Sequence, residues 1–333
     1  MAKIKDVAQQ AGVSSATVSR VLNGDAGVAA ASRERVLEAV RALGYKPNRL
    51  ARNLRRQQTE TIGVVVSEIE NPHFTQAVRG IEDAAFRHGY RVLLCNTDET
   101  PAKQRAYLEM LAAERVRGVI LAPADAADPM IGQLLARDVP IVAFDRGVDD
   151  PLADAVIADN AYASRRAVRH LRDAGRRQVG FIGGRPDIQT GQERLAGYLA
   201  AAEEVGQEPF WVEGAFRVEE AFAATRELLE LHPEIDGLVV ANNLMTIGAM
   251  KAIRRCGRRI GEDIGLVAFD DPVWAEFVDP PLTTLAQPVR RMAAQAIELL
   301  FERIEGRRTQ PRTVVFTFEL LVRASSGKLP AMS

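Results

Sequence analysis

The side chains best suited to binding a small molecule follow short apolar runs between residues 61 and 333, where buried strands are expected to end. These side chains are Ser67, Asn71, His73, Phe74, Asp145, Arg146, Asp187, Arg194, Phe216, Asn242 and Asp270. Carboxylates, guanidinium groups and amides can each hold two adjacent hydroxyl groups, while an aromatic ring packs against the apolar face of a sugar. Trp274, four residues after Asp270, offers a further stacking surface. The residue types therefore predict a polar cleft with aromatic walls that binds a neutral polyhydroxyl ligand.

The charges of these residues favour a sugar that carries no phosphate group. Asp145 and Asp270 stand against Arg194, so the expected site has no excess of positive charge. A phosphorylated sugar would be repelled unless Arg146 or His73 compensates for its charge. We therefore expect an unphosphorylated pentose or hexose, with a sugar acid or a purine as the alternatives. Each residue also has a purely structural alternative, because an Asp can cap a helix and an Arg can pair within the core.

The elements that must position these residues alternate along the chain. Apolar runs form two sets, first IGVVV, RVLLC, GVIL, IVAF and AVIAD, and then VGFIG, WVEG, GLVVA and IGLVAF. Segments of helical period separate them, at residues 74–88, 102–115, 130–137, 192–205, 219–231 and 245–256. Such alternation predicts two α/β lobes with parallel sheets, and a ligand at the carboxyl ends of the strands.

The chain is expected to pass between these lobes near Asn160, near Gln287 and again near the C-terminus. The first lobe then comprises about residues 61–160 and 289–320, and the second about 161–288 and 321–330. Two lobes joined by several strands make a hinged cleft, which is a common place for a ligand.

A basic segment precedes the two lobes. Residues 1–60 hold 11 Lys and Arg against 5 Asp and Glu, a net charge of +6, whereas residues 61–333 carry a net charge of −7. An apolar stripe from Ile4 to Ala11 predicts a short helix that ends at Gly12, and Ser14 can cap a second helix over residues 15–22. A third helix is expected at residues 32–43, before Gly44. Two short helices around a glycine-containing turn predict a helix-turn-helix, which binds DNA.

The second helix of this motif presents one face to the major groove. The expected DNA contacts on it are Ser15, Ala16, Thr17, Ser19 and Arg20. Arg20 is the natural reader of guanine, because its guanidinium can donate to O6 and N7 together, a contact worth about 1–3 kcal/mol of discrimination.

A short basic linker follows. Asn48 can cap residues 49–56, which hold four arginines around Leu50 and Leu54. So short a helix is unstable alone in water, so we expect it to fold on DNA, with Leu54 as a wedge in the minor groove. A plain polar linker is the alternative interpretation.

Composition excludes several classes of protein. With 333 residues, 47% hydrophobic and 26% charged, the chain is not collagen-like, disordered or a disulfide scaffold. Cys95 and Cys256 lie far apart in the sequence and favour a reducing compartment. The N-terminus has no apolar signal region and no long apolar stretch occurs, so we expect a cytoplasmic protein that is associated with the nucleoid when bound to DNA and is not inserted in a membrane.

Enzymatic activity is not expected. The sequence contains neither a phosphate-binding G-x-x-x-x-G-K-[ST] loop nor a G-x-S-x-G nucleophile motif, and its histidines, at 73, 88, 170 and 232, lack metal-binding spacing. We therefore expect neither a metal nor a cofactor. A sugar receptor without a regulatory role is a further alternative, but the helix-turn-helix argues against it.

The segments IKDVAQQAGVSSATVSRVLNG, GYKPNRLARNL and TIGVVVSEIENPHF resemble the lactose/galactose repressor family of bacterial transcription regulators. The likeness continues in order through AVRGIEDAAFRHGY, VIADN, ERLAGY, ANNLMTIGAM and PPLTTLAQP, so it covers nearly the whole chain. It implies a helix-turn-helix at residues 1–47, a hinge helix at 48–60 and, at 61–333, a core like that of periplasmic sugar-binding proteins. It also implies that an effector bound in the core controls affinity for operator DNA.

Residue by residue, the resemblance implies base contacts by Ser15, Ala16 and Arg20 and a minor-groove contact by Leu54. In the core it implies effector contacts by His73, Phe74, Asp145, Arg194, Phe216, Asn242 and Asp270, and it adds Gln287. The pattern VSSATVSR is similar to that of relatives whose pseudo-palindromic operators have a central CpG step. The C-terminal segment has no leucine heptads, which favours a homodimer over a tetramer. Repression relieved by a ligand is the family default, while a purine corepressor or a phosphocarrier protein partner are the alternatives.

Overall fold

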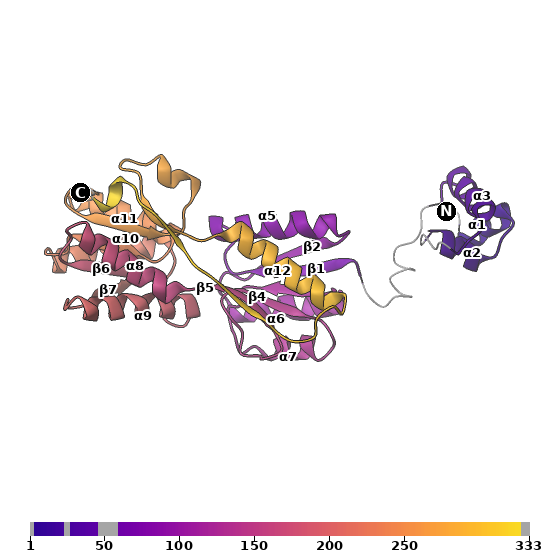
Figure 1. Ribbon diagram of the computed structural model, residues 1–333, viewed down its shortest axis with the longest axis horizontal. Helices are drawn as coiled ribbons and strands as arrows, with labels where there is room; N and C mark the ends of the chain where they lie inside the picture. The colour runs from indigo at the N-terminus through magenta and orange to yellow at the C-terminus, as the bar shows by residue number, and fades with distance from the viewer. Residues whose placement is uncertain (1–2, 23–26, 46–58, 328–333) are drawn as a thin grey trace. The chain divides into compact units, whose positions relative to one another are not determined.

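The helices at the N-terminus belong to the first of two units into which the computed structural model divides, Met1–Thr59 and Glu60–Ser333. The structure describes residues 3–22, 27–45 and 59–327 (Figure 1). The predicted DNA contacts Asn48 and Leu54 lie outside the described residues, so the expected hinge helix stays a prediction.

The first unit contains the helix-turn-helix that the sequence predicts. Its helices are α1 (Ile4–Ala11), α2 (Ser15–Leu22) and α3 (Ala30–Ala42). Gly12 ends α1 with φ of 63°, a left-handed conformation that glycine adopts without strain. The backbone N–H of Thr17 donates to Ser14 Oγ at 3.1 Å, which caps α2 as expected. Val18 and Val36 are completely buried, so the three helices close one small core.

The second unit begins with a lobe built on a wholly parallel sheet of strand order β11-β5-β4-β3-β1-β2. Its strands are β1 (Thr61–Val66), β2 (Arg91–Asn96), β3 (Val119–Leu121), β4 (Ile141–Asp145), β5 (Asp154–Ala158) and β11 (Thr313–Phe316). Its helices are α5 (Pro72–Arg87), α6 (Pro101–Ala113), α7 (Pro129–Leu135) and α12 (Val289–Ile304). Strands β3 and β4 are buried throughout, which explains their uninterrupted apolar sequence.

The other lobe repeats this plan with strand order β12-β10-β9-β8-β6-β7. Its strands are β6 (Val179–Gly183), β7 (Phe210–Glu213), β8 (Gly237–Val240), β9 (Gly265–Phe269), β10 (Thr283–Ala286) and β12 (Glu319–Leu321). Its helices are α8 (Asn160–Asp173), α9 (Gln189–Glu204), α10 (Val218–Leu231) and α11 (Asn243–Arg255), with the short 3-10 helices η1 (Val273–Glu276) and η2 (Ala324–Ser326). The six helical segments that the sequence predicts in the core correspond to α5, α6, α7, α9, α10 and α11.

Three segments connect the lobes, and Figure 1 shows the last of them in yellow, where the chain runs from the lobe that contains α12 to the other lobe. They lie between β5 and α8, between β10 and α12, and between β11 and β12 at residues 317–318. The second sheet is mixed rather than wholly parallel, because β12 runs antiparallel to β10. The carboxyl edges of the two sheets face each other, so a strand that leaves the first sheet by this edge enters the second sheet against the direction of its neighbours.

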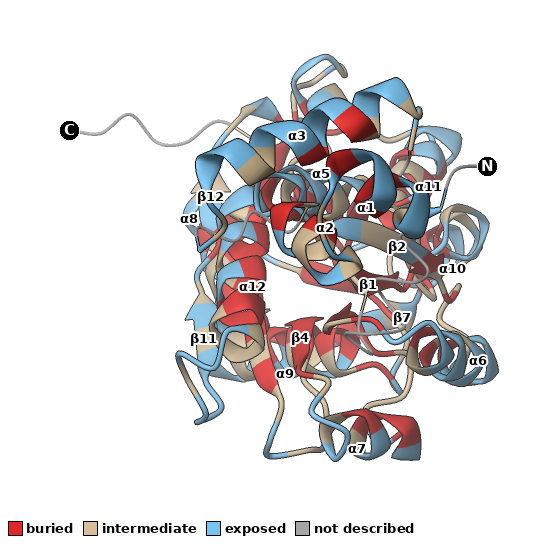
Figure 2. Cartoon of the chain, turned by 90° about the vertical axis from the view of Figure 1, so that its right-hand side faces the viewer, coloured by how far each residue is buried: buried red, intermediate tan, exposed pale blue. Residues whose placement is uncertain are grey.

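One hydrophobic core runs through both lobes, from Ile62 in the first to Phe318 at the third crossing. Figure 2 shows the buried residues in red on β1, β4 and the inner face of α12. Cys95 is buried and Cys256 is partly buried, and both are free thiols. In the described ranges, every helix is too short or too polar to cross a membrane.

Tyr198 ties the edge of the second sheet to α9. It is completely buried, stacks on Phe181 with ring centroids 5.0 Å apart, and accepts a hydrogen bond from the backbone N–H of Phe210 at 2.9 Å. Burial raises the pKa of Tyr198 to about 12. The hydroxyl therefore fixes the start of β7, the strand that leads to one wall of the cleft described below.

We predict that Tyr198→Phe lowers the free energy of unfolding of the second unit by about 1–3 kcal/mol, because the N–H of Phe210 loses its buried partner. Urea unfolding followed by tryptophan fluorescence measures this, since both tryptophans lie in this unit. Tyr162→Phe is the control, because that ring is 43% exposed and the change should stay within about 0.5 kcal/mol. Equal effects of the two substitutions would contradict the role of the Tyr198 hydroxyl.

Candidate functional site

A cleft with about 620 Å³ of space, open solvent included, lies between the two lobes of the second unit. Its walls include most of the side chains expected from the sequence to contact a ligand, namely Asn71, His73, Phe74, Asp145, Arg146, Arg194, Phe216, Asn242, Asp270 and Gln287. Ser67 and Asp187 do not line the cleft, and Trp274 stands in η1 and packs against the hydrophobic core instead. The structure thus brings the expected side chains together at the carboxyl edges of both sheets, as parallel sheets require.

Two aspartates stand at equivalent places in the two lobes. Asp145 ends β4 with φ of 70°, and Asp270 follows β9 with φ of 68°. Asp tolerates this left-handed conformation better than most residues with a side chain. Both carboxylates are buried, with 7% of each residue exposed. The same local turn therefore directs one carboxylate into the cleft from each sheet.

Nitrogen atoms of two side chains flank the carboxylate of Asp145. His73 Nε2 lies 3.3 Å from its Oδ1, and Arg146 Nε lies 3.5 Å from its Oδ2. Burial opposes ionisation of Asp145, but His73, Arg146 and Arg194 outweigh burial and hold its pKa well below the usual range. Asp145 is therefore a carboxylate that accepts hydrogen bonds at physiological pH.

Asp270 is held by two amide side chains. Its Oδ2 accepts from Asn243 Nδ2 at 3.1 Å, and its Oδ1 accepts from Gln287 Nε2 at 3.0 Å. Asn243 Nδ2 also donates to Oδ1 of Asn71, in the other lobe, at 2.9 Å. This chain of amides links a carboxylate of the second lobe to the N-cap of α5 in the first.

The guanidinium of Arg194 lies on the floor of the cleft and is 4% exposed. Its Nε donates to Asn160 Oδ1 at 2.8 Å and its Nη1 donates to the carbonyl of Ala241, while its carbon lies 4.4 Å from the centroid of the Phe269 ring. Burial lowers the pKa of Arg194, although the cleft carboxylates oppose this shift. An Arg stays protonated at physiological pH, so a full positive charge stands between the two aspartates.

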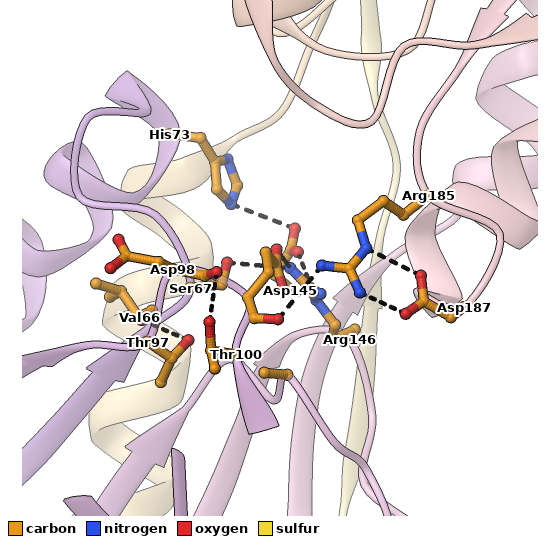
Figure 3. Close-up of polar contacts among 12 residues, drawn as sticks. Val66, Ser67, His73, Thr97, Asp98, Thr100, Asp145, Arg146, Arg185 and Asp187 are labelled. Carbon is orange, nitrogen blue, oxygen red and sulfur yellow. Dashed lines mark hydrogen bonds and ion pairs between the residues drawn. The ribbon is translucent and has the colours of Figure 1, made fainter. Parts of the chain in front are cut away.

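Arg146 is turned toward a residue that the sequence did not single out. Its Nη1 and Nη2 donate to the two carboxylate oxygens of Glu99 at 3.0 and 2.7 Å. Nη2 also donates to Ser67 Oγ at 3.1 Å, and Figure 3 labels Arg146 and Ser67. Burial lowers the pKa of Arg146, but Glu99 and Asp145 outweigh burial and raise it overall.

Phe216 forms an aromatic wall because glycine stands behind it. A Cβ built on Gly184 would lie 2.0 Å from the tip of the Phe216 ring, so a side chain there would push the ring away. On the first lobe Phe74 packs edge-on against His73, with ring centroids 5.0 Å apart. Asn242 also caps α11, since its Oδ1 accepts from the N–H of Met245 at 2.7 Å.

Several residues of the cleft escape prediction because helix starts and loops supply them. Glu99, Thr190 and Arg217 line the cleft, and so does Arg185. Arg185 pairs with Asp187 (Figure 3), and its Nη1 also donates to the carbonyl of Glu99 at 3.3 Å. In the sequence, the only indication of contacts in this region was the position of Asp187 and Arg194 near the FIGG run.

The expected DNA contacts that the structure describes lie on α2. Ala16 and Arg20 are exposed, while Ser15, Thr17 and Ser19 are partly buried. The hydroxyl of Thr17 lies 2.9 Å from that of Ser14, so Thr17 also supports the cap of α2. Arg20 therefore stands on the face that the sequence assigns to the major groove.

The side chains of the cleft can bind a small polar molecule through hydrogen bonds and packing against aromatic rings. Within residues 3–22, 27–45 and 59–327, no group of three or more His, Cys, Asp and Glu side chains could hold a metal ion. Fold and site together define a two-lobed ligand-binding core joined to a helix-turn-helix head.

Comparisons with known proteins agree with this architecture. The model described as "Periplasmic binding proteins and sugar binding domain of LacI family" matches residues 59–324, and that described as "Bacterial regulatory proteins, lacI family" matches residues 3–48. The HTH-type transcriptional repressor PurR of Aliivibrio salmonicida is 35% identical over 99% of this chain and 100% of its own. The ribose operon repressor of Halalkalibacterium halodurans is 36% identical over 98% of this chain and 97% of its own. The lac repressor dimer bound to operator and the anti-inducer ONPF has a TM-score of 0.87, with 29% identity over 98% of this chain and 99% of its own.

The chain belongs to the LacI family of bacterial regulatory proteins. It is a DNA-binding transcriptional repressor with a ligand-binding core, and not an enzyme. The resemblance stated from the sequence is thereby confirmed.

The charge network of the cleft predicts a pH dependence of stability. The pKa of Asp145 is lower in the folded protein than in the unfolded chain, so its ionisation stabilises the fold above the unfolded pKa of about 4 and this stabilisation is lost as pH falls. We therefore expect Asp145→Asn to lower the free energy of unfolding at pH 7, with the difference from the wild type shrinking below about pH 4. Urea unfolding at a series of pH values measures this difference. A difference that stays constant across the series would contradict the charge network around Asp145.

Proposed function

We propose that the cleft binds a neutral sugar, most simply a pentose, and that this sugar controls the affinity of the repressor for its operator. The observation that carries the proposal is the buried Asp145, Arg194 and Asp270 group, which presents acceptors and donors without an excess of positive charge. Carboxylates accept from sugar hydroxyls and a guanidinium donates to them, so one ring can be held from both lobes.

The lining of the cleft supports a ligand of this kind. Phe216 offers a ring face for an apolar side of the sugar, in the same cleft as the polar groups of Asp145, Arg194 and Asp270. Gln287 and Asn242 add amides at the rim of the same cleft. The relative named as a ribose operon repressor makes D-ribose the first sugar to test.

We further propose that α2 reads the operator, with Arg20 on a guanine and Ser15, Ala16, Thr17 and Ser19 as smaller contacts. Asn48 is proposed to cap the hinge segment, and Leu54 to insert as a wedge into the minor groove. A homodimer would place two heads on a pseudo-palindromic operator with a central CpG step, since a two-fold protein matches a two-fold site. The related lac repressor binds its operator as a dimer, which supports this proposal.

The effector is tested by thermal melting of the full chain with D-ribose, a hexose, ribose 5-phosphate, a sugar acid and a purine base. A ligand at 100 times its Kd adds about 2.7 kcal/mol, so the cognate sugar should raise the Tm by about 5 °C or more. Asp270→Ala should abolish this shift and the ligand's effect on operator affinity, while the ligand-free variant still binds DNA. Asp173→Ala, an exposed Asp on the same lobe, is the control and should respond like the wild type.

A response to the purine base alone would replace the sugar proposal with the corepressor alternative. A response to ribose 5-phosphate alone would contradict the charge argument. An unchanged dose response in Asp270→Ala would remove that carboxylate from the binding site.

DNA recognition is tested by Arg20→Ala in anisotropy titrations with an operator selected from random duplexes and with a scrambled duplex. We expect the specific affinity to fall by about 1–3 kcal/mol while the affinity for the scrambled duplex changes little, because a base contact carries specificity. Arg41→Ala removes the same charge from α3 and is the matched control, for which the ratio of the two affinities should stay constant. A constant ratio in Arg20→Ala as well would rule out base readout by this residue.

A further inference from the structure

The two lobes carry the same unusual turn at equivalent positions. Asp98 and Glu99 follow β2 with φ of 50° and 53°, and Ala215 and Phe216 follow β7 with φ of 52° and 61°. Both turns line the cleft. In the second lobe the turn presents the ring of Phe216, and in the first it presents the carboxylate of Glu99. The position of Glu99 in the fold is therefore that of a ligand wall.

Hydrogen bonds hold the turn of the first lobe in this conformation. The N–H of Glu99 donates to the carbonyl of Ser67 at 3.1 Å, the hydroxyl of Thr100 donates to the carbonyl of Asp98 at 3.1 Å, and Asn96 Nδ2 donates to Asp98 Oδ1 at 2.6 Å. Two successive left-handed residues other than glycine are unfavourable unless the surroundings fix them. The direction of the Glu99 side chain is thus fixed before any ligand binds.

The carboxylate of Glu99 fills the guanidinium fork of Arg146. Both Nη atoms of Arg146 donate to it, and the side chains are largely buried, with 14% of Glu99 and 5% of Arg146 exposed. Such a fork is the usual partner of a ligand phosphate or carboxylate, because two parallel N–H groups match two oxygens. Since Glu99 already occupies both, the strongest anion-binding group on this wall is closed to a ligand.

We propose that Glu99 is a specificity-determining residue, which makes the cleft select an uncharged sugar over its phosphate ester by neutralising Arg146. This inference rests on the proposed sugar-binding function. Glu99 acts through Arg146 and is a positioning residue, whereas Arg146 lines the cleft itself.

The side chains of the other arginines of the cleft donate to partners other than the Glu99 carboxylate or are exposed to solvent. Arg194 donates to Asn160 and to a backbone carbonyl, and Arg185 Nε donates to Asp187 at 3.0 Å. Arg217 is exposed, so solvent and salt screen its charge. Removal of the Glu99 charge therefore changes the electrostatics of the cleft chiefly at Arg146, which Glu99 pairs with directly, and more weakly at Arg185, whose pKa Glu99 also raises.

The test compares D-ribose with ribose 5-phosphate by isothermal titration of the full-length wild type and of Glu99→Gln. We expect the ratio of the Kd for the phosphate ester to the Kd for ribose to fall by about tenfold or more in Glu99→Gln, because a buried cation becomes available to the phosphate. Glu302→Gln is the matched control. It removes the carboxylate from another partly buried Arg–Glu pair, with Arg308 Nε 2.8 Å from Glu302, outside the cleft. Its ratio should equal that of the wild type.

An unchanged ratio in Glu99→Gln, or an equal change in Glu302→Gln, would overturn the inference. If Glu99→Gln does not fold, Glu99→Asp withdraws the charge from the fork by one methylene and should lower the ratio by a smaller factor; an unchanged ratio there also overturns it. If the wild type binds neither sugar, the proposed effector is wrong, and inorganic phosphate then tests Glu99 separately. Phosphate binding by Glu99→Gln but not by the wild type supports the inference, and binding by neither or both overturns it.

Discussion

The buried guanidinium of Arg194 is the contact on which the rest of the cleft depends. Two carboxylates at the ends of β4 and β9 would repel each other in a site of low polarity, and Arg194 offsets both charges from below. Its own burial is tolerated because Asn160, a backbone carbonyl and the face of Phe269 surround it. The buried charges of this network offset one another, so removal of any one charge leaves the others to bear the cost of burial.

The two lobes share a plan, and the site arises where they differ. Each lobe ends a central strand with an Asp in a left-handed conformation and follows its edge strand with a left-handed pair of residues. The backbone thus offers two matched sets of positions, one on each side of the cleft. Glu99 opposite Phe216 makes the walls unequal, since one wall carries a closed ion pair and the other an open ring. A ligand therefore meets polar and apolar contacts on different sides.

Much of this site can be predicted from the sequence, because the carboxyl ends of parallel strands converge wherever the lobes meet. Asp145, Asn242 and Asp270 follow apolar runs directly. Once these runs are recognised as strands, the three residues are expected to lie close together. Glu99 and Asn243 could not be predicted, because their directions depend on a left-handed turn and on the amide chain between lobes. Trp274 was expected to line the cleft, but it lies in η1 and packs against the hydrophobic core.

Ligand binding reaches the connections between the lobes directly, because each of the three crossings supplies a residue to the network of the cleft. Asn160 of the first accepts from Arg194, Gln287 of the second donates to Asp270, and the ring of Phe318 at the third lies 6.0 Å from the Arg194 guanidinium. A ligand that forms hydrogen bonds with Arg194 and Asp270 would therefore compete with or reinforce the contacts that set the angle between the lobes. Only the difference in its affinity for two such angles can change DNA binding. The network that lines the cleft is thus where such a difference in affinity would arise.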